Sequence, residues 1–350
     1  MEHDLVVKSG ITIRSETGLP DCVTIDAQQL GSNLLCDALD GTTVISGIRL
    51  LAGEAGNSGG IIQCTGGSSP YFERCIFERG VADLSGGGVY CLNSTPNFVD
   101  CQFLGNSVNA GNGGALAAFG SSPVLTGCLF RGNGSQGDGG GMNIEGGVLS
   151  LNNCTFEENN ASNYGGGLRS IDCGGEITDC RFQGNIAGSG GGGALINWGD
   201  VVLLNSSFEG NQAAGLWGGG LQTGGGVAHT VQADNCIFTA NSTPEGGGIM
   251  GGSNLILRYC GISENVASNY GGGIKFNGGI HLEVEYSTIL GNIAPDVADG
   301  LIHWNGTATL RCCEIETSAW HDLAVITIDN EDCQVAVERS SWGSLKSLFR

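Results

Sequence analysis

Apolar and polar positions alternate in short runs along this chain, and the runs return at a nearly constant interval. Each run aligns on the pattern C-x-F-x-x-N, as in "CQFLGN" from Cys101 and "CRFQGN" from Cys180. Successive copies start 24 to 30 residues apart, most often 26 or 27, which indicates a repeat architecture. The copies begin at Cys75, Cys101, Cys128, Cys154, Cys180, Ser206, Cys236, Cys260, Ser287 and Cys313.

Three kinds of position are fixed within each repeat. An apolar residue follows a glycine cluster, another lies three positions before the cysteine column, and the phenylalanine column lies two positions after it. This period of two is typical of strands, and no segment has a sustained helical period. Three short strands cannot bury their own apolar face, so the copies must stack. We predict an all-β, single-stranded, right-handed parallel β-helix, a solenoid of about a dozen coils with about 26 residues per coil.

Stacking in register places like residues over like residues at about 4.8 Å. It predicts a phenylalanine ladder from Phe77 to Phe238, a cysteine ladder and an asparagine ladder. We expect each ladder asparagine at a turn, in the left-handed region that asparagine tolerates, with its amide hydrogen-bonded along the axis. The asparagine ladder comprises Asn106, Asn133, Asn159, Asn185, Asn211, Asn241, Asn265 and Asn292.

The repeats divide one continuous domain into three parts. Residues 1–60 are rich in strand signals but lie off the strict pattern, and we read them as the first coils. Residues 61–330 carry the regular repeats, and 331–350 contain the last strand and a segment that we expect to cap the open end of the solenoid. The apolar residues of this cap, spaced for one amphipathic turn, are Trp342, Leu345, Leu348 and Phe349.

Composition and charge narrow the functional classes. The 64 glycines argue against a helical fold, because each one in a helix interior costs about 1 kcal/mol relative to alanine. A net charge of −21 repels nucleic acid. The sequence contains no run of 18 apolar residues, so it predicts no membrane-spanning helix. The start, "MEHDLVVKSG", lacks the basic and apolar regions of an export signal, so we expect a trimmed form or a fragment of an exported protein.

Eight of the 15 cysteines belong to the ladder column and are predicted to be small buried core residues, and we expect the cysteines to be free structural thiols. In-register neighbours have parallel Cβ vectors, which suit a disulfide poorly. Cys312 and Cys313 are adjacent and should point to opposite faces of a strand. No C-x₂-C pair or cluster of cysteine and histidine predicts zinc. We assign no metal and no cofactor, and Ca²⁺ is left open for the scattered acidic residues although the nonapeptide calcium repeat is absent.

The stretch ASNYGGG occurs twice, at 161–167 and 267–273, four repeats apart. Its tyrosine belongs to a column that directly precedes the glycine cluster, in which Tyr164, Trp217 and Tyr270 recur on alternate coils. Rings about 9–10 Å apart on one face match two sugar units of an extended β-linked glycan, and open glycine backbone lets a ligand approach. The alternative is that each ring only covers the glycines beside it.

The repeats resemble a known class of bacterial proteins. "GGAL" at 113–116 with "FRGN" at 130–133 resembles the polymorphic outer membrane protein repeats of chlamydial autotransporter adhesins. The lead-in "ITIRSETGLPDCVTIDA", with "SSPYFERC", "STPNFVDC" and "SSPVLTGC", is similar to secreted right-handed β-helix proteins of the pectin-lyase-like superfamily. The resemblance covers nearly the whole chain and implies a secreted or cell-surface location. Because its motifs are scaffold residues, it implies little about function. Full-length members usually carry an export signal and a membrane barrel or sorting tail, which this sequence lacks.

The same superfamily includes polysaccharide lyases and glycoside hydrolases, so charged columns are candidates for catalysis. Arg74, Asp100 and Asp179 precede ladder positions, and Asp138 and Glu245 precede glycine clusters. Asp100 and Asp179 are three coils apart, about 14 Å, too far for a catalytic pair. We expect Arg74 directly beneath Asp100, in an exposed ion pair. We assign no catalytic residue, because no common column holds the histidines His3, His229, His281, His303 and His321.

These observations favour a non-catalytic extracellular or cell-surface rod that presents a binding face. The expected ligand is a polysaccharide or a cell-surface glycan, with adhesion as the related role, and we expect a monomer. The alternatives are a polysaccharide lyase or glycoside hydrolase and a purely structural passenger or spacer.

Overall fold

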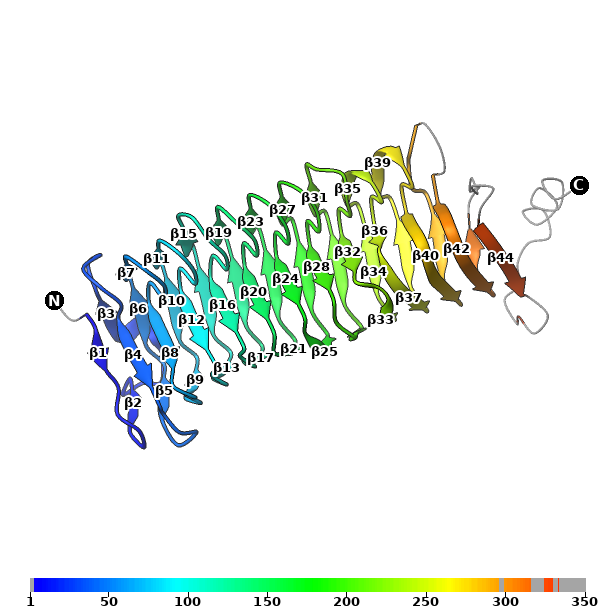
Figure 1. The fold of residues 1–350 in the computed structure, drawn as a ribbon. Helices are drawn as coiled ribbons and strands as arrows, with labels where there is room; N and C mark the ends of the chain where they lie inside the picture. The colour runs from blue at the N-terminus through cyan, green and yellow to red at the C-terminus, as the bar shows by residue number, and fades with distance from the viewer. Residues whose placement is uncertain (1–2, 296–298, 316–323, 330–332, 334–350) are drawn as a thin grey trace, which may run out of the picture.

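The computed structural model describes residues 3–295, 299–315, 324–329 and 333, and it shows a stack of short strands that advances along one axis (Figure 1). Twelve strands in one of its sheets mark twelve coils, so the predicted parallel β-solenoid is confirmed. Within these residues the one helix is the 3-10 turn η1 (Pro20–Cys22), and no helix is long and apolar enough to cross a membrane.

The broadest sheet has 23 strands in two columns, which share β40 (Ile274–Glu285) and β42 (Leu301–Arg311) at the C-terminal end. The first column comprises β1 (Leu5–Val6), β4 (Leu34–Asp37), β8 (Ile62–Thr65), β12 (Val89–Leu92), β16 (Leu116–Phe119), β20 (Met142–Glu145), β24 (Leu168–Ile171), β28 (Ala194–Asn197), β32 (Leu221–Gly224) and β36 (Ile249–Gly251). The second comprises β2 (Thr12–Arg14), β5 (Val44–Ser46), β9 (Tyr71–Glu73), β13 (Asn97–Val99), β17 (Val124–Thr126), β21 (Val148–Asn152), β25 (Gly174–Thr178), β29 (Val201–Leu204), β33 (Gly226–Asp234), β37 (Ser253–Arg258) and β44 (Ala324–Asp329).

Two narrower sheets complete each coil. The 12-stranded sheet comprises β3 (Thr24–Asp26), β6 (Arg49–Leu51), β10 (Ile76–Glu78), β14 (Gln102–Leu104), β18 (Leu129–Arg131), β22 (Thr155–Glu157), β26 (Arg181–Gln183), β30 (Ser207–Glu209), β34 (Ile237–Thr239), β38 (Gly261–Ser263), β41 (Thr288–Leu290) and β43 (Glu314–Ile315). The nine-stranded sheet comprises β7 (Glu54–Ala55), β11 (Val81–Ala82), β15 (Ser107–Val108), β19 (Gly134–Ser135), β23 (Asn160–Ala161), β27 (Ile186–Ala187), β31 (Gln212–Ala213), β35 (Ser242–Glu245) and β39 (Val266–Tyr270).

The core is a column of stacked rings, as predicted. Successive phenylalanines from Phe77 to Phe238 lie with ring centroids 4.4–4.9 Å apart and are fully buried. Ile262 and Ile289 continue the same column in later coils. Because β-strands of adjacent coils pair in register, a residue type that packs well in one coil packs well over its own copy in the next.

The predicted asparagine ladder is confirmed, but its backbone explanation is wrong. The amides of adjacent coils are hydrogen-bonded, for example Asn133 Nδ2 to Asn159 Oδ1 at 2.9 Å. The left-handed residue is the one before each asparagine, such as Gly132 at φ 64° and Glu158 at φ 55°. The physical reason is that the turn is completed one residue earlier, which leaves the asparagine side chain pointing into the core to bond its neighbours.

The cysteine column is buried and its thiols are free, as predicted. A second buried column was missed by the sequence pattern, because Cys36, Cys64 and Cys91 lie in the first strand column rather than before a phenylalanine. Both columns place thiols where other coils have small or apolar residues, such as Ala118 after Cys91. They therefore act as core packing residues.

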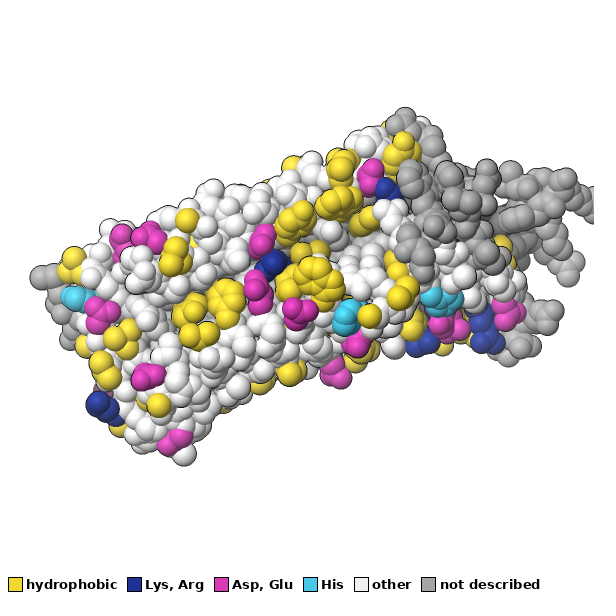
Figure 2. Space-filling model, in the orientation of Figure 1, with side chains coloured by type: hydrophobic (Ala, Val, Ile, Leu, Met, Phe, Trp, Pro, Cys, Tyr) yellow, Lys and Arg dark blue, Asp and Glu magenta, His cyan; other side chains and the backbone are white. Residues whose placement is uncertain are grey.

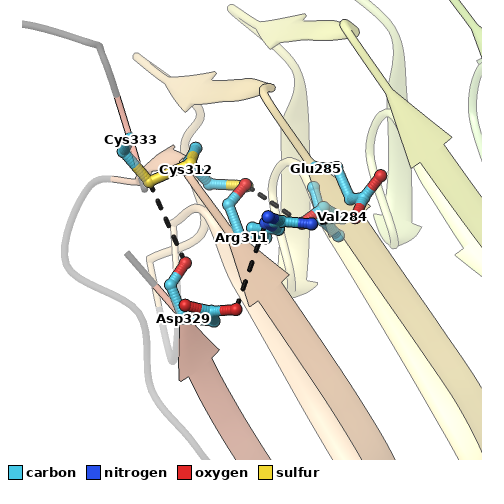
Figure 3. Close-up of a disulfide and its surroundings, with 7 residues drawn as sticks. Val284, Glu285, Arg311, Cys312, Asp329 and Cys333 are labelled. Carbon is cyan, nitrogen blue, oxygen red and sulfur yellow. Dashed lines mark hydrogen bonds and ion pairs between the residues drawn. A yellow bond between two sulfur atoms is a disulfide. The ribbon is translucent and has the colours of Figure 1, made fainter. Parts of the chain in front are cut away.

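The prediction of free thiols is wrong for one pair, because Cys312 forms a disulfide with Cys333 (Figure 3). Cys312 is a left-handed residue outside the ladder, and its partner comes from a segment 21 residues later rather than from an adjacent coil. Cys312 and Cys333 are therefore not in-register neighbours, whose parallel Cβ vectors disfavour a disulfide. Cys313 lies in the core, where its Sγ contacts the Val284 carbonyl oxygen at 3.1 Å, so the two adjacent cysteines point apart as predicted. The predicted capping residues of 331–350 lie outside the described residues.

Candidate functional site

The structure places the three predicted aromatic residues in one column beside the first strand column. Tyr164 is bridged to Gly190, and Gly190 to Trp217, while Glu245 lies opposite Tyr270. Each aromatic side chain is half-buried, and each is two coils from the next. In-register coils therefore set an interval of about 9.6 Å along the axis between neighbouring aromatic positions.

Each tyrosine of the row has an acidic residue in the preceding coil and a basic residue in its own coil, and these two side chains form an ion pair. Asp138, in the coil before Tyr164, contacts Arg169 Nε at 3.3 Å and accepts a hydrogen bond from the Tyr164 backbone N–H at 3.1 Å. Glu245, in the coil before Tyr270, forms an ion pair with Lys275. The Lys275 ammonium lies 5.7 Å from the centroid of the Tyr270 ring, within range of a cation–π contact.

The repeated stretch ASNYGGG is thus the visible part of a larger arrangement. An acidic residue lies in one coil, and the next coil contains a tyrosine. A basic residue follows this tyrosine by five positions, as Arg169 follows Tyr164 and Lys275 follows Tyr270. Our sequence reasoning considered Asp138 and Glu245 only as candidates for catalysis and did not assign the cations. The signal was present in the letters after the glycines, "LRS" and "IKF". Lys275 balances Glu245 at Tyr270, whereas Arg169 at Tyr164 is shared by Asp138 and Glu145, which leaves an excess of one acid at that point.

Between Tyr164 and Trp217 the row lacks a side chain, because Gly190 occupies this position. A Cβ at Gly190 would collide with Oε1 of Gln222, which is buried and has no hydrogen-bond partner. The neighbouring outward positions, Leu195 and Met250, are almost fully buried. Figure 2 shows apolar side chains gathered on this face beside a hollow. Between the rings, Leu195 and Met250 therefore offer almost no accessible area, and the unsatisfied Gln222 Oε1 lies below the surface.

The other charged candidates are not brought together. Arg74 and Asp100 are in the same left-handed column, but the ion pair that we predicted between them is absent. Arg74 instead contacts Glu73 at 3.2 Å, and its guanidinium extends toward Gly18 of the first coil, away from Asp100. Asp179 accepts a hydrogen bond from Asn205 at 3.1 Å, as one step of an exposed polar ladder.

The histidines that the structure describes do not form a common site. His281 Nδ1 lies 2.8 Å from the Thr307 hydroxyl, and His229 Nδ1 lies 3.9 Å from Asp200. His3 contacts its neighbour Asp4 at 3.0 Å. The side chain of His303 and all of His321 lie outside the described residues. Within the described residues no group of three or more histidine, cysteine and acidic side chains could hold a metal ion.

Two exposed aromatic residues, Trp198 and Tyr259, were missed by the sequence reasoning. Trp198 follows β28, at the end of the strand away from the row, and half of it is exposed. Its signal lies in the repeat alignment, because glycine occupies the corresponding position in other coils, as at Gly120 and Gly146.

No protein-family model, curated protein or solved structure matches this chain. The fold is therefore assigned from the structure alone, and the resemblance to secreted repeat proteins is supported only by the sequence motifs.

Proposed function

We propose that this protein is a non-catalytic extracellular or cell-surface rod that binds an extended polysaccharide along the row of Tyr164, Trp217 and Tyr270. The observation that carries the proposal is the register, which repeats an aromatic side chain on every second coil of one face. A linear glycan has a repeating length of its own, so it can meet equivalent rings without bending. The resemblance to secreted β-helix proteins of the pectin-lyase-like superfamily and to chlamydial adhesin repeats supports the location, and because its motifs are scaffold residues the role rests on the row itself.

The chemistry of the row favours a neutral or weakly charged glycan. Half-buried tyrosine and tryptophan rings offer apolar faces for stacking and polar edges for hydrogen bonds. Lys275 balances Glu245 near Tyr270, and Arg169 near Tyr164 is shared by Asp138 and Glu145, so the row has no excess positive charge that would select an anionic glycan.

The test compares the wild-type protein with a Tyr164→Ala/Trp217→Ala/Tyr270→Ala variant on a panel of soluble and insoluble polysaccharides. The matched control is Tyr259→Ala/Tyr286→Ala, which removes a stacked pair with ring centroids 5.2 Å apart from a different corner of the coil. Thermal unfolding of both variants verifies that the solenoid is intact. We expect at least one polysaccharide to bind the wild type and the control, and to lose most of its affinity for the row variant.

Release of soluble oligosaccharides is measured in the same samples. Products would replace the proposal by the lyase or hydrolase alternative. Failure of every polysaccharide to bind a folded wild-type protein would leave the rings as covers of the glycine clusters, and the rod as a spacer.

A further inference from the structure

Trp198 occupies a left-handed backbone position that glycine, asparagine and aspartate adopt more readily. It lies in a column of left-handed residues at the corner after the first strand column, with φ of 54°. Gly120 and Gly146 hold this position in earlier coils, and Asp172 and Gly225 hold it on either side of Trp198. A bulky residue is disfavoured in this conformation, and half of the side chain (51%) is exposed to solvent. A strained, exposed tryptophan in an otherwise regular repeat is a candidate for binding.

Two carboxylates flank this tryptophan. Asp172 lies directly beneath it in the preceding coil, since β24 and β28 pair in register and the Asp172 N–H donates to the Asn197 carbonyl oxygen. Asp200 follows Trp198 by two residues, and 72% of its side chain is exposed. Within the described residues neither carboxylate forms an ion pair with lysine or arginine. This differs from the row, where Asp138 is paired with Arg169 and Glu245 with Lys275.

A bulge in the next coil adds a wall to the same corner. The register of β33 against β37 shifts between Gly226 and Thr230, so 227–229 protrude from the ladder. Val227 is largely exposed (68%), and His229 lies beside the Trp198 backbone with its Nδ1 buried and without a hydrogen-bond partner. Figure 2 shows acidic and histidine side chains bordering apolar ones on this face.

We propose that this corner, formed by Trp198, Asp172, Asp200 and the bulge 227–229, binds the guanidinium group of an arginine presented by a basic partner protein. An arginine side chain stacks on an indole face, and its N–H edge donates to carboxylates at the ring's border. The exposed polar groups that the corner offers are two carboxylates, that of Asp172 and that of Asp200, which accepts a hydrogen bond from the Thr230 N–H at 2.7 Å and lies 3.9 Å from His229 Nδ1. The net charge of −21 draws a basic surface toward the rod. This site is separate from the glycan row and does not depend on it.

The test uses the full chain and a fluorescein-labelled (Gly-Arg)₃ peptide, with (Gly-citrulline)₃ as a neutral isostere. Trp198→Ala leaves the net charge unchanged, so it separates stacking from general attraction of a cation to an acidic protein. Asp172→Asn/Asp200→Asn is matched by Glu16→Gln/Glu54→Gln, which removes the same charge from two exposed positions near the N-terminus. Circular dichroism confirms that each variant is folded.

We expect the arginine peptide to bind and the citrulline peptide not to bind. Trp198→Ala should weaken binding by about 2-fold to 30-fold, and Asp172→Asn/Asp200→Asn should weaken it more than the matched control does. Equal binding by wild type and Trp198→Ala, or equal losses in the two charge variants, would overturn the proposal, because binding would then be diffuse. Binding of a neutral oligosaccharide that Trp198→Ala abolishes, without binding of the arginine peptide, would assign the corner to sugars instead.

Discussion

Asn133 Oδ1 accepts two hydrogen bonds from Asn106, one from its backbone N–H at 2.9 Å and one from its Nδ2 at 3.0 Å. Asn133 in turn donates in the same way to Asn159, and the pattern continues to Asn292. Only an amide of this length can accept from the coil before and donate to the coil after. The Asn133 side chain therefore satisfies buried polar groups of the coil before it and of the coil after it.

Replacing one rung should destabilise the solenoid strongly. Asn159→Leu removes the acceptor for both donors of Asn133 and the donor for the carbonyl oxygens of Phe130 and Asn185 Oδ1. Because these groups remain buried, we expect a loss of about 2–4 kcal/mol in the free energy of unfolding, measured by urea denaturation. The adjacent Asn160→Ala, on the exposed side of β23, should change it by less than about 0.5 kcal/mol. Similar effects of the two substitutions would contradict the role of the ladder.

The ion pair between Glu245 and Lys275 should show strong coupling. Both side chains are largely buried, at 14% and 4% exposed. Lys275→Met leaves the Glu245 carboxylate without its cation, so we expect a loss of about 3–5 kcal/mol. Glu245→Gln/Lys275→Met removes both charges and should be less destabilising than the sum of the single substitutions. A double-mutant cycle by chemical denaturation measures the coupling, and additive effects would show that the charges act independently.

The sequence was sufficient to predict columns but not the contacts between them. A strict period determines which residues stack, so the rings from Phe77 to Phe238 and the row of Tyr164 could be derived from spacing alone. Long charged side chains reach into neighbouring columns, which is why Arg74 contacts Glu73 rather than Asp100. The Cys312 disulfide could not be predicted either, because a partner 21 residues away breaks the period on which the reasoning depends.

Alkaline pH should destabilise the protein through its buried thiols. Burial raises the pKa of the Cys101 thiol, and burial also raises the pKa of Cys313. An unfolded thiol ionises near pH 8.5, so above this pH the unfolded chain has fewer bound protons than the folded one. The free energy of unfolding must then fall as pH rises, by up to about 1.4 kcal/mol per pH unit for each such thiol.

Cys101→Ser tests this relationship, because serine already fills the same column at Ser206 and Ser287. Urea denaturation between about pH 8 and pH 10 should give a shallower decline for the variant than for the wild type, by the contribution of one thiol. Below about pH 8 the offset between the two proteins should be constant. Parallel declines at alkaline pH would show that Cys101 ionises equally in the folded and unfolded states.

The backbone strain in the left-handed column that contains Trp198 can be tested by comparing a glycine of this column with a glycine outside it, both of which have room for a side chain. A Cβ added at Gly146, where φ is +67°, or at Gly134 would meet no atom within 4 Å. Gly134→Ala, outside the left-handed region, should stabilise the protein by about 0.4–1 kcal/mol by restricting the unfolded chain. Gly146→Ala should destabilise it by about 1–2 kcal/mol, because only the backbone conformation opposes the side chain. Thermal and urea unfolding measure both effects. Equal effects would mean that the column tolerates side chains freely. Trp198, which lies two coils further along the same column, would then not be strained by its backbone conformation.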